Sequence, residues 1–256
     1  MSLSVKNCHV RDGNISLTLK PVRKYNIKTD SKSYYTSVTT WCGNLFPKFD
    51  STLVIENMMK GKNWNPENKY WGMTPDEIKK LWSNAGTVSS EAGTTLHNMI
   101  ESYMNGEKIS SDEATWYMFL EFDQDIKDME PYRTEWMVYD ENVKLSGCID
   151  MVYKKKDGTY AIYDWKRCKP FVEKNIKNEG STNDLISHIP NTDYWKYVLQ
   201  LNTYRMILHR CYGLKVTELK LVRFGPDQDT YEIKDVPILQ EEMEALFEEI
   251  KKKQVL

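Results

Sequence analysis

The stretch Leu145–Lys169 constrains the fold of this chain more than any other part of the sequence. Residues 145–153 and 160–165 are both rich in apolar and aromatic side chains, which favour β-strands. Between them lies Asp157-Gly158, a dipeptide typical of the tight turn of a hairpin. The sequence therefore predicts two antiparallel strands joined by a short turn.

Charged residues occur where this hairpin should be apolar. Asp150 and Asp164 each fall inside one of the two apolar runs, and Lys166 follows two residues after Asp164. A buried carboxylate is costly unless it is paired or binds a cation. Side chains two residues apart on a strand point to the same face of the sheet. We therefore expect a cation site on the hairpin with an ammonium group beside it, and a structural salt-bridge cluster is the alternative.

Composition limits the class of protein. The chain has 256 residues, of which 40% are hydrophobic and 28% charged, with a formal net charge of −2. This length fits one large domain or a domain with an added lobe, and no apolar run is long enough to cross a membrane. The five cysteines are scattered without C-x-x-C spacing, which argues against a zinc finger and indicates free thiols. Because the N-terminus also lacks a signal-peptide pattern, we expect a protein of a reducing intracellular compartment, cytoplasm or nucleus, that is not secreted.

The rest of the chain alternates between helix and strand patterns. A turn-rich tetrad at residues 11–14 predicts a β-hairpin of residues 5–10 and 15–19, within an N-terminal extension that covers residues 1–30. A polar stretch at 173–193 predicts a long loop. Helices are expected to start at 36–40 and after Asp50 and to cover 74–84, 89–105, 112–129, 194–212 and 238–252, with further strands at 133–139, 215–224 and 230–236.

Three more polar residues lie in apolar surroundings. His97 and Glu101 are four residues apart, so on a helix they project from one face, beside a stripe that includes Leu96 and Ile100. Glu135 falls inside a run of aromatic and apolar residues with strand character. Taken alone, a histidine on a helix is more often a structural residue than a ligand.

Four short motifs follow one another along the chain: G-x-x-x-H at Gly93–His97, G-x-x-D at Gly147–Asp150, D-x-K at Asp164–Lys166 and Q-x-x-x-Y at Gln200–Tyr204. Each motif alone is weak, but the ordered set, which spans roughly residues 37–213, resembles the RecB-like branch of the PD-(D/E)xK nuclease superfamily. Within this branch the chain is most similar to phage or viral exonucleases and to mitochondrial genome maintenance exonucleases, which act on single-stranded DNA ends. It lacks the cysteine cluster that binds an iron–sulfur cluster in some members, and it lacks a helicase part.

The resemblance implies an α/β fold with a restriction-endonuclease-like core. Helices would flank a central mixed sheet of about five strands, and a helical N-terminal region would form an arch over the cleft. The expected nuclease domain covers residues 31–256. Its parts are a helical arch at 36–130, a catalytic core at 89–224 and a C-terminal hairpin and helix at 215–256.

Phosphodiester hydrolysis needs an activated water molecule and stabilisation of charge on the phosphate oxygens. Asp150 and Asp164 offer hard oxygen ligands that suit Mg²⁺ or Mn²⁺. Lys166 would orient the attacking water and offset charge in the transition state. The resemblance implies that His97 and the backbone carbonyl of Trp165 complete the set of metal ligands.

Other residues are candidates for auxiliary roles. Glu101 and Glu135 would hold metal-bound waters or a second ion. Gln200 and Tyr204 would contact DNA or order Lys166, with helix packing as the alternative. Hydroxyl and N–H groups near the expected start of the His97 helix would contact a phosphate, from Ser89, Ser90 and Thr94. Three tryptophans either stack on bases or pack in a core: Trp64, Trp71 and Trp82.

These features predict a metal-dependent deoxyribonuclease with Mg²⁺ or Mn²⁺ as cofactor. The expected substrate is DNA, most specifically single-stranded ends that an exonuclease would shorten, and replication or recombination proteins are the candidate partners. A structure- or sequence-specific endonuclease on the same fold is one alternative, and a nucleic-acid-binding protein that no longer cleaves is the other. The sequence leaves cleavage polarity, the choice between DNA and RNA, and oligomeric state open.

Overall fold

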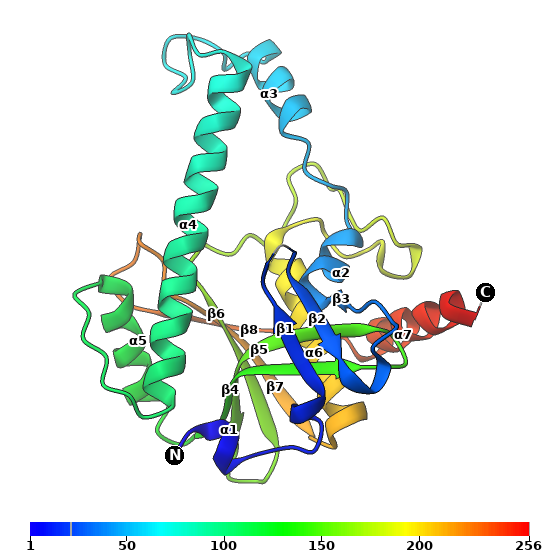
Figure 1. The fold of residues 1–256 in the computed structure, drawn as a ribbon. Helices are drawn as coiled ribbons and strands as arrows, with labels where there is room; N and C mark the ends of the chain where they lie inside the picture. The colour runs from blue at the N-terminus through cyan, green and yellow to red at the C-terminus, as the bar shows by residue number, and fades with distance from the viewer. Residues whose placement is uncertain (21, 256) are drawn as a thin grey trace. The chain divides into compact units, whose positions relative to one another are not determined.

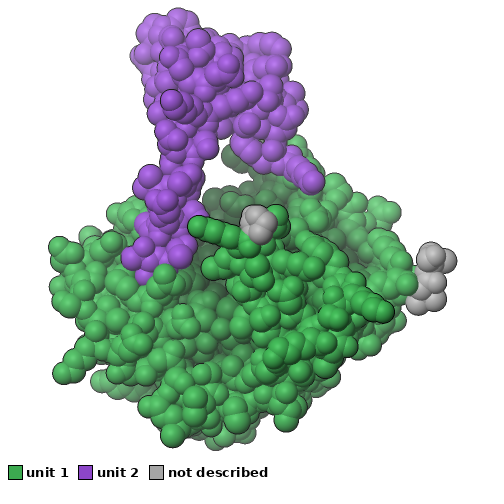
Figure 2. All heavy atoms as spheres, in the orientation of Figure 1, with its two compact units in different colours: residues 1–47, 96–256 green, residues 48–95 purple. Residues whose placement is uncertain are grey.

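The computed structural model describes residues 1–20 and 22–255. It divides into two compact units, one made of residues 1–47 and 96–256 and the other of residues 48–95 (Figure 2). The first unit holds the sheet and the second is helical. Each unit is described separately below.

A mixed six-stranded sheet forms the centre of the first unit (Figure 1). The predicted hairpin is confirmed, because β5 and β6 pair antiparallel, and β4 pairs antiparallel with β5. β6 and β7 pair in parallel, and β8 closes the edge beside β7. The sequence predicts five of these strands and misses β3, a two-residue strand that is too short to carry a pattern. The strands are β3 (Thr36–Ser37), β4 (Glu130–Asp140), β5 (Leu145–Lys154), β6 (Tyr160–Lys166), β7 (Val216–Arg223) and β8 (Glu232–Asp235).

Helices pack on both faces of this sheet, as the resemblance implies (Figure 1). One apolar core includes Val152 and Ile162 of the hairpin and residues of α2 (Val38–Asn44), α6 (Asp193–Tyr212) and α7 (Gln240–Val255). The opposite core includes Met151, Tyr163 and Trp165, together with α5 (Ala114–Asp125) and residues 96–104, the last part of α4 (Pro75–Met104). Strand alternation thus places neighbouring hairpin residues in different cores. Among the described residues, no helix combines the length and apolar character that a membrane span requires.

The longest helix of the first unit, α6, ends where the sequence predicts. Thr192 caps its start by accepting a hydrogen bond from the Trp195 N–H, and Gly213 ends it with φ 69°. A left-handed conformation at this position favours glycine. Before α6, residues 167–192 form the expected loop, which contains a short 3₁₀ turn at Asp184–Ile186. Both ends of α6 are therefore defined by specific residues, Thr192 and Gly213.

The N-terminal segment, residues 1–30, differs from the prediction. Residues 5–10 do not form a strand; the segment begins with α1 (Leu3–Lys6) and a 3₁₀ turn at Asp12–Asn14. The observed hairpin pairs β1 (Ile15–Thr18) with β2 (Lys24–Ile27). Val5 and Val10, which suggested the strand, are 62% and 91% exposed, so their alternation does not correspond to a buried face. Ile15, Tyr25 and Ile27 are the buried residues instead.

The second unit, residues 48–95, consists of α3 (Ser51–Lys60), a turn-rich connection and the first part of α4. The predicted capping box is present: the Thr74 N–H donates to Glu77 at 2.7 Å, and the Glu77 N–H donates to the Thr74 hydroxyl at 3.3 Å. The prediction of two helices, 74–84 and 89–105, is wrong, because the chain stays helical between them. Gly86 alone weakens a helix by only about 1 kcal/mol, which neighbouring turns can offset.

Aromatic side chains pack against one another within this second unit. Trp82 lies near Phe49 and Tyr70, with ring centroids 6.2 and 6.0 Å apart, and its Nε1 donates to the Tyr70 hydroxyl. The Trp64 and Trp71 rings are 5.6 Å apart. These contacts agree with the packing interpretation of the tryptophans, although Trp71 remains 47% exposed.

Candidate active site

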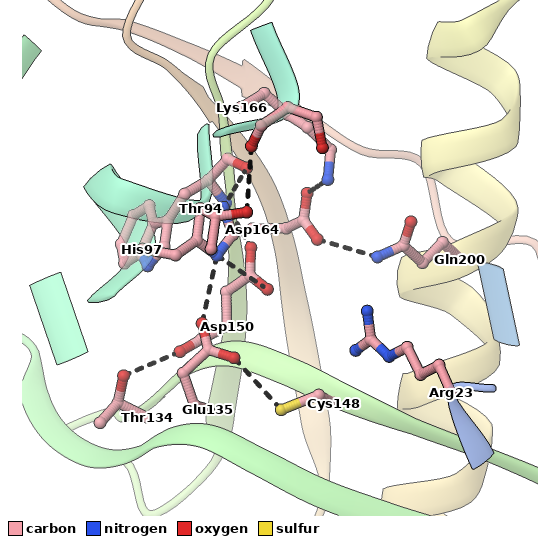
Figure 3. A network of polar contacts seen from close by, with 12 residues as sticks. Arg23, Thr94, His97, Thr134, Glu135, Cys148, Asp150, Asp164, Lys166 and Gln200 are labelled. Carbon is pink, nitrogen blue, oxygen red and sulfur yellow. Dashed lines mark hydrogen bonds and ion pairs between the residues drawn. The ribbon is translucent and has the colours of Figure 1, made fainter. Parts of the chain in front are cut away.

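Asp164 and Lys166 lie on the face of β6 that α6 covers. The side chain of Asp164 is almost fully buried and forms an ion pair with the Lys166 ammonium (Figure 3). Gln200 of α6 donates from Nε2 to Asp164 Oδ1 at 3.0 Å. The Lys166 Nζ also lies 4.5 Å from the centre of the Tyr197 ring. The ammonium is therefore held from two sides, by a carboxylate and by an aromatic face.

Asp150 lies on β5, next to the strand that carries Asp164. The backbone N–H of Trp165 donates to Asp150 Oδ2 at 2.8 Å, so pairing of the two strands orients this carboxylate. On the other side, the Thr134 hydroxyl donates to the backbone carbonyl of Asp150 at 3.0 Å. The two aspartates predicted from the sequence are thus neighbours, each fixed by a contact from another element.

His97 reaches the same place from α4. Its Nδ1 lies 3.1 Å from Glu135 Oε1 and 3.7 Å from Asp150 Oδ1, and its Nε2 lies 3.2 Å from the Trp165 carbonyl oxygen. Which ring nitrogen donates depends on the tautomer. The structure thus brings His97, Asp150 and the Trp165 carbonyl together, and their binding of a metal ion stays a prediction.

Glu135 has an unusual backbone. Its φ is 42°, a left-handed conformation that is rare for a residue within a strand and costs about 1–3 kcal/mol. It lies between the register pairs Thr134↔Met151 and Trp136↔Ile149, on the strand beside Asp150. Its carboxylate accepts a hydrogen bond from the Cys148 thiol at 3.2 Å in addition to contacting His97. Glu135 thus adds a second carboxylate beside the histidine, next to that of Asp150.

Burial and neighbouring opposite charges shift the pKa values of these groups in opposite directions. Burial lowers the pKa of His97, but Asp150 and Glu135 outweigh it and raise the pKa to about 9. Burial raises the pKa of Asp150 and raises that of Asp164 to about 6. Burial also acts to lower the pKa of Lys166, yet Asp164 and Asp150 hold that pKa above its ordinary value. The carboxylates therefore bind positive charge strongly.

The donor atoms fit a divalent cation. One ligand atom each from His97, Glu135 and Asp150 lie within 4.8 Å of one another, and the Trp165 carbonyl oxygen is in contact with the same imidazole. Carboxylate and carbonyl oxygens with one imidazole suit hard and borderline divalent metals. Because a histidine ligand must be neutral, a bound cation would displace the proton from His97. Asp164 does not belong to this group of three, and its role as a ligand stays a prediction.

Glu101 lies one turn beyond His97 on α4. It lines a cavity of about 180 Å³ together with Glu135, on the side of β4 that faces the N-terminal segment. Burial raises its pKa, and the charge of Glu135 adds to this effect. Glu101 is therefore close to the site, but it does not share the group of donor atoms.

Tyr204 and Gly147 form a close contact that the sequence motifs do not reveal. A Cβ atom at position 147 would lie 2.6 Å from Cε1 of the Tyr204 ring, so only glycine fits there. Gln200, one turn earlier on the same helix, reaches Asp164. The Q-x-x-x-Y motif thus contacts both strands of the β5–β6 hairpin: Tyr204 packs on Gly147 of β5, and Gln200 donates to Asp164 of β6.

Ser89 and Thr94 are not near a helix start, because α4 begins at Pro75. Their backbone N–H groups lie inside the helix, and the Thr94 hydroxyl donates to the Ser90 carbonyl at 3.0 Å. The predicted phosphate site at a helix N-terminus is therefore wrong. Both side chains are exposed, and direct contact of their hydroxyls with DNA stays a prediction.

Tyr197 is the site residue that the sequence analysis missed. It lies three residues before Gln200, a spacing that places both side chains on one face of a helix. Because Gln200 is a candidate from the sequence, its three-residue spacing from Tyr197 is the signal that could have identified Tyr197 as well.

Comparison with known proteins gives one family match. Residues 73–255 match a family model described as the PD-(D/E)XK nuclease superfamily. No curated protein matches the chain. Among solved structures, SSO0001 is similar with 14% identity and a TM-score of 0.36, over 99% of this chain and 81% of that one. A candidate exonuclease from Eubacterium rectale is similar with 16% identity and a TM-score of 0.40, over 86% of this chain and 79% of that one.

Proposed function

The chain belongs to the PD-(D/E)XK nuclease superfamily, and from this premise we propose that it is an Mg²⁺- or Mn²⁺-dependent deoxyribonuclease that shortens single-stranded DNA from its ends. The observation that carries the proposal is the convergence of two groups on the β5–β6 hairpin. One is the set of cation donors His97, Glu135 and Asp150. The other is the ammonium of Lys166, paired with Asp164.

The charge balance of the site favours a catalytic centre over a structural salt-bridge cluster. Three carboxylates, from Glu135, Asp150 and Asp164, surround one ammonium and one imidazole. A self-contained ion-pair cluster would be expected to balance its charges, because unpaired buried charge is costly. The excess of negative charge supports a cation as part of the working site.

The residues have separable roles in hydrolysis. A divalent cation held there would lower the pKa of a water molecule and offset charge on the phosphate oxygens. Lys166 orients the attacking water and stabilises charge that develops on the phosphate. Asp164 holds the ammonium in place, and Gln200 holds Asp164. Trp165 fixes Asp150 through its backbone N–H, so ligand and ammonium keep their spacing.

Exonuclease action on single-stranded ends rests on the motif order, which resembles the RecB-like branch. The test uses end-labelled linear single strands, the duplex form and a covalently closed single-stranded circle, with Mg²⁺, Mn²⁺ or a chelator. We expect stepwise shortening of the linear strand, an intact circle and no cleavage with the chelator. Cleavage of the circle would indicate an endonuclease instead.

A lysine substitution tests the mechanism. Lys166→Gln keeps a hydrogen-bond donor towards Asp164 but removes the charge, and we expect cleavage to fall by about 10²–10³-fold. The control is Lys253→Gln, an exposed lysine of α7, which should cleave like the wild type. Circular dichroism and urea unfolding verify that each variant is folded. Full activity in folded Lys166→Gln would contradict the assigned role.

A further inference from the structure

An arginine of the N-terminal segment points into the catalytic site. Arg23 directly precedes β2, and Figure 3 shows its guanidinium directed from this hairpin towards the polar network, between Gln200 and Cys148. The sequence predicts only an N-terminal extension for residues 1–30. The structure brings this part of the chain beside the catalytic hairpin.

The backbone that carries Arg23 is held firmly. Tyr25 and Ile27, the next inward-facing residues, are only 4% and 2% exposed and pack with Tyr35 and Tyr139. Tyr139 belongs to β4, the strand that also carries Glu135. A buried apolar cluster thus anchors the strand that directly follows Arg23.

The guanidinium of Arg23 is free to bind a ligand. It is exposed, and within residues 1–20 and 22–255 its one hydrogen bond is a long contact of 3.5 Å to the Tyr25 hydroxyl, with no ion pair. By contrast, four other arginines are paired with carboxylates: Arg11, Arg133, Arg210 and Arg223. An arginine without an ion pair that is directed towards this network is available to a ligand of negative charge.

We propose that Arg23 binds a backbone phosphate of the polynucleotide next to the scissile phosphodiester, an inference that rests on the proposed nuclease function. The planar guanidinium can donate two parallel hydrogen bonds to phosphate oxygens. This contact orients the strand against the carboxylates, which repel it. Arg23 is therefore a positioning residue that acts on substrate binding.

Arg23 is directed towards a thiol that contacts one of the cation donors. Figure 3 shows the Arg23 guanidinium pointing towards the part of the network where Cys148 lies. Cys148 donates its thiol hydrogen to Glu135, one of the cation donors. A phosphate bound by Arg23 would thus lie close to the metal ligands.

The test measures binding of a fluorescein-labelled single-stranded oligonucleotide to the full-length protein in chelator, over a series of salt concentrations. Arg23→Ala should bind at least about tenfold more weakly, because hydrogen bonds to charged groups are strong. The slope of log affinity against log salt should also decrease by about 0.7, the value for one phosphate contact on a single strand. Arg23→Lys should restore the slope but only part of the affinity.

Lys24→Ala is the matched control, because Lys24 is the next residue, is exposed and points to the opposite face of the hairpin. It should keep the slope of the wild type. An unchanged slope in Arg23→Ala, or a wild type that does not bind the oligonucleotide, would overturn the proposal. Binding that depends on Arg23 without any cleavage in Mg²⁺ or Mn²⁺ would leave the phosphate contact standing and overturn the nuclease function.

Discussion

The catalytic hairpin β5–β6 and the N-terminal segment lie beside the same site but are held by different forces. Nearly every residue of β5 and β6 is buried, with apolar cores on both faces. The N-terminal segment exposes Val5 and Val10, and polar contacts as well as a small apolar cluster around Tyr139 attach it to β4. Asp12 is central among them: its carboxylate accepts from Arg133 Nη1 at 2.7 Å and from Trp136 Nε1 at 2.9 Å.

This difference shows two ways of fixing a charge in place. In the hairpin, apolar packing sets the positions of Asp150 and Lys166, so the shape of the core determines the chemistry. In the N-terminal segment, ion pairs such as Asp12–Arg133 act together with a small apolar cluster that includes Tyr25 and Ile27, so the position of Arg23 depends on charge as well as on packing. We expect the first region to respond to changes of volume and the second to changes of charge.

The largest expected effect comes from breaking the ion pair of the N-terminal segment. Asp12→Ala leaves Arg133, whose side chain is only 6% exposed, without its partner. The free energy of unfolding should fall by about 3 kcal/mol, as for other buried pairs that lose one member. Hydrogen exchange should increase throughout residues 1–30, and oligonucleotide affinity should fall as in Arg23→Ala.

The matched control for this change is Glu130→Ala. Glu130 pairs with Lys6, and so joins the same segment to the same strand, but both side chains are more than half exposed. Its loss should cost under about 1 kcal/mol. Equal effects of the two substitutions would mean that burial does not distinguish the two ion pairs.

A smaller effect is expected from a change of volume in the catalytic hairpin. Gly147→Ala forces a Cβ atom to within 2.6 Å of the Tyr204 ring. Overpacking of this kind costs about 1–3 kcal/mol, and it should lower cleavage because β5 must shift. Urea unfolding and kcat give the two readouts.

Two further variants test whether the contact with the Tyr204 ring causes the loss of stability. Adding Tyr204→Leu to Gly147→Ala should recover part of the lost stability, since the smaller leucine side chain leaves room for the Cβ atom at position 147. Gly93→Ala serves as the control, because a Cβ at that helical position meets no atom within 4 Å. Alanine there should stabilise the helix by up to about 1 kcal/mol. If the double variant were no more stable than Gly147→Ala, the steric explanation would fail.

The smallest expected effect is the pH dependence of the stability that Asp12 contributes. Burial acts to raise the pKa of Asp12, but Arg133, the His9 N–H and Trp136 together lower it below its ordinary value. The ionised form is therefore favoured in the folded state. The ionised Asp12 carboxylate contributes fully to the free energy of unfolding above about pH 4, which is its ordinary pKa. This contribution is lost as the pH falls through the lowered pKa of the folded state.

The wild type and Asp12→Asn test this dependence. The difference between their free energies of unfolding should be constant near neutral pH and should shrink as the pH falls below about 4. Urea unfolding at several pH values measures it. A difference that stays constant down to pH 2 would show that Asp12 does not act through its charge.

Local patterns explain which parts of this molecule the sequence could predict. The hairpin, the i, i+2 pair of Asp164 and Lys166, and α6 with Gln200 all follow from periodicity and turn residues. The N-terminal segment does not, because its attachments join positions far apart in the chain. The Asn7 amide donates to the Tyr132 carbonyl, and no local pattern marks such a contact.

Backbone conformation limits prediction of the site in the same way. The φ of 42° at Glu135 depends on the strand beside it and on the contacts of its carboxylate. Sequence reasoning therefore placed Glu135 among the auxiliary residues, whereas the structure places it with His97 and Asp150. Asp164, also expected as a ligand, contacts Lys166 and Gln200, and its role as a ligand stays a prediction.

The contact between Gly147 and Tyr204 restricts how this sequence can change over generations. While the Tyr204 ring is present, any side chain at position 147 meets it at 2.6 Å. A lineage can therefore replace the tyrosine first and fill the space at 147 afterwards, whereas the reverse order passes through an overpacked protein. The two positions change as a pair with a fixed order of steps, although 56 residues separate them in the chain.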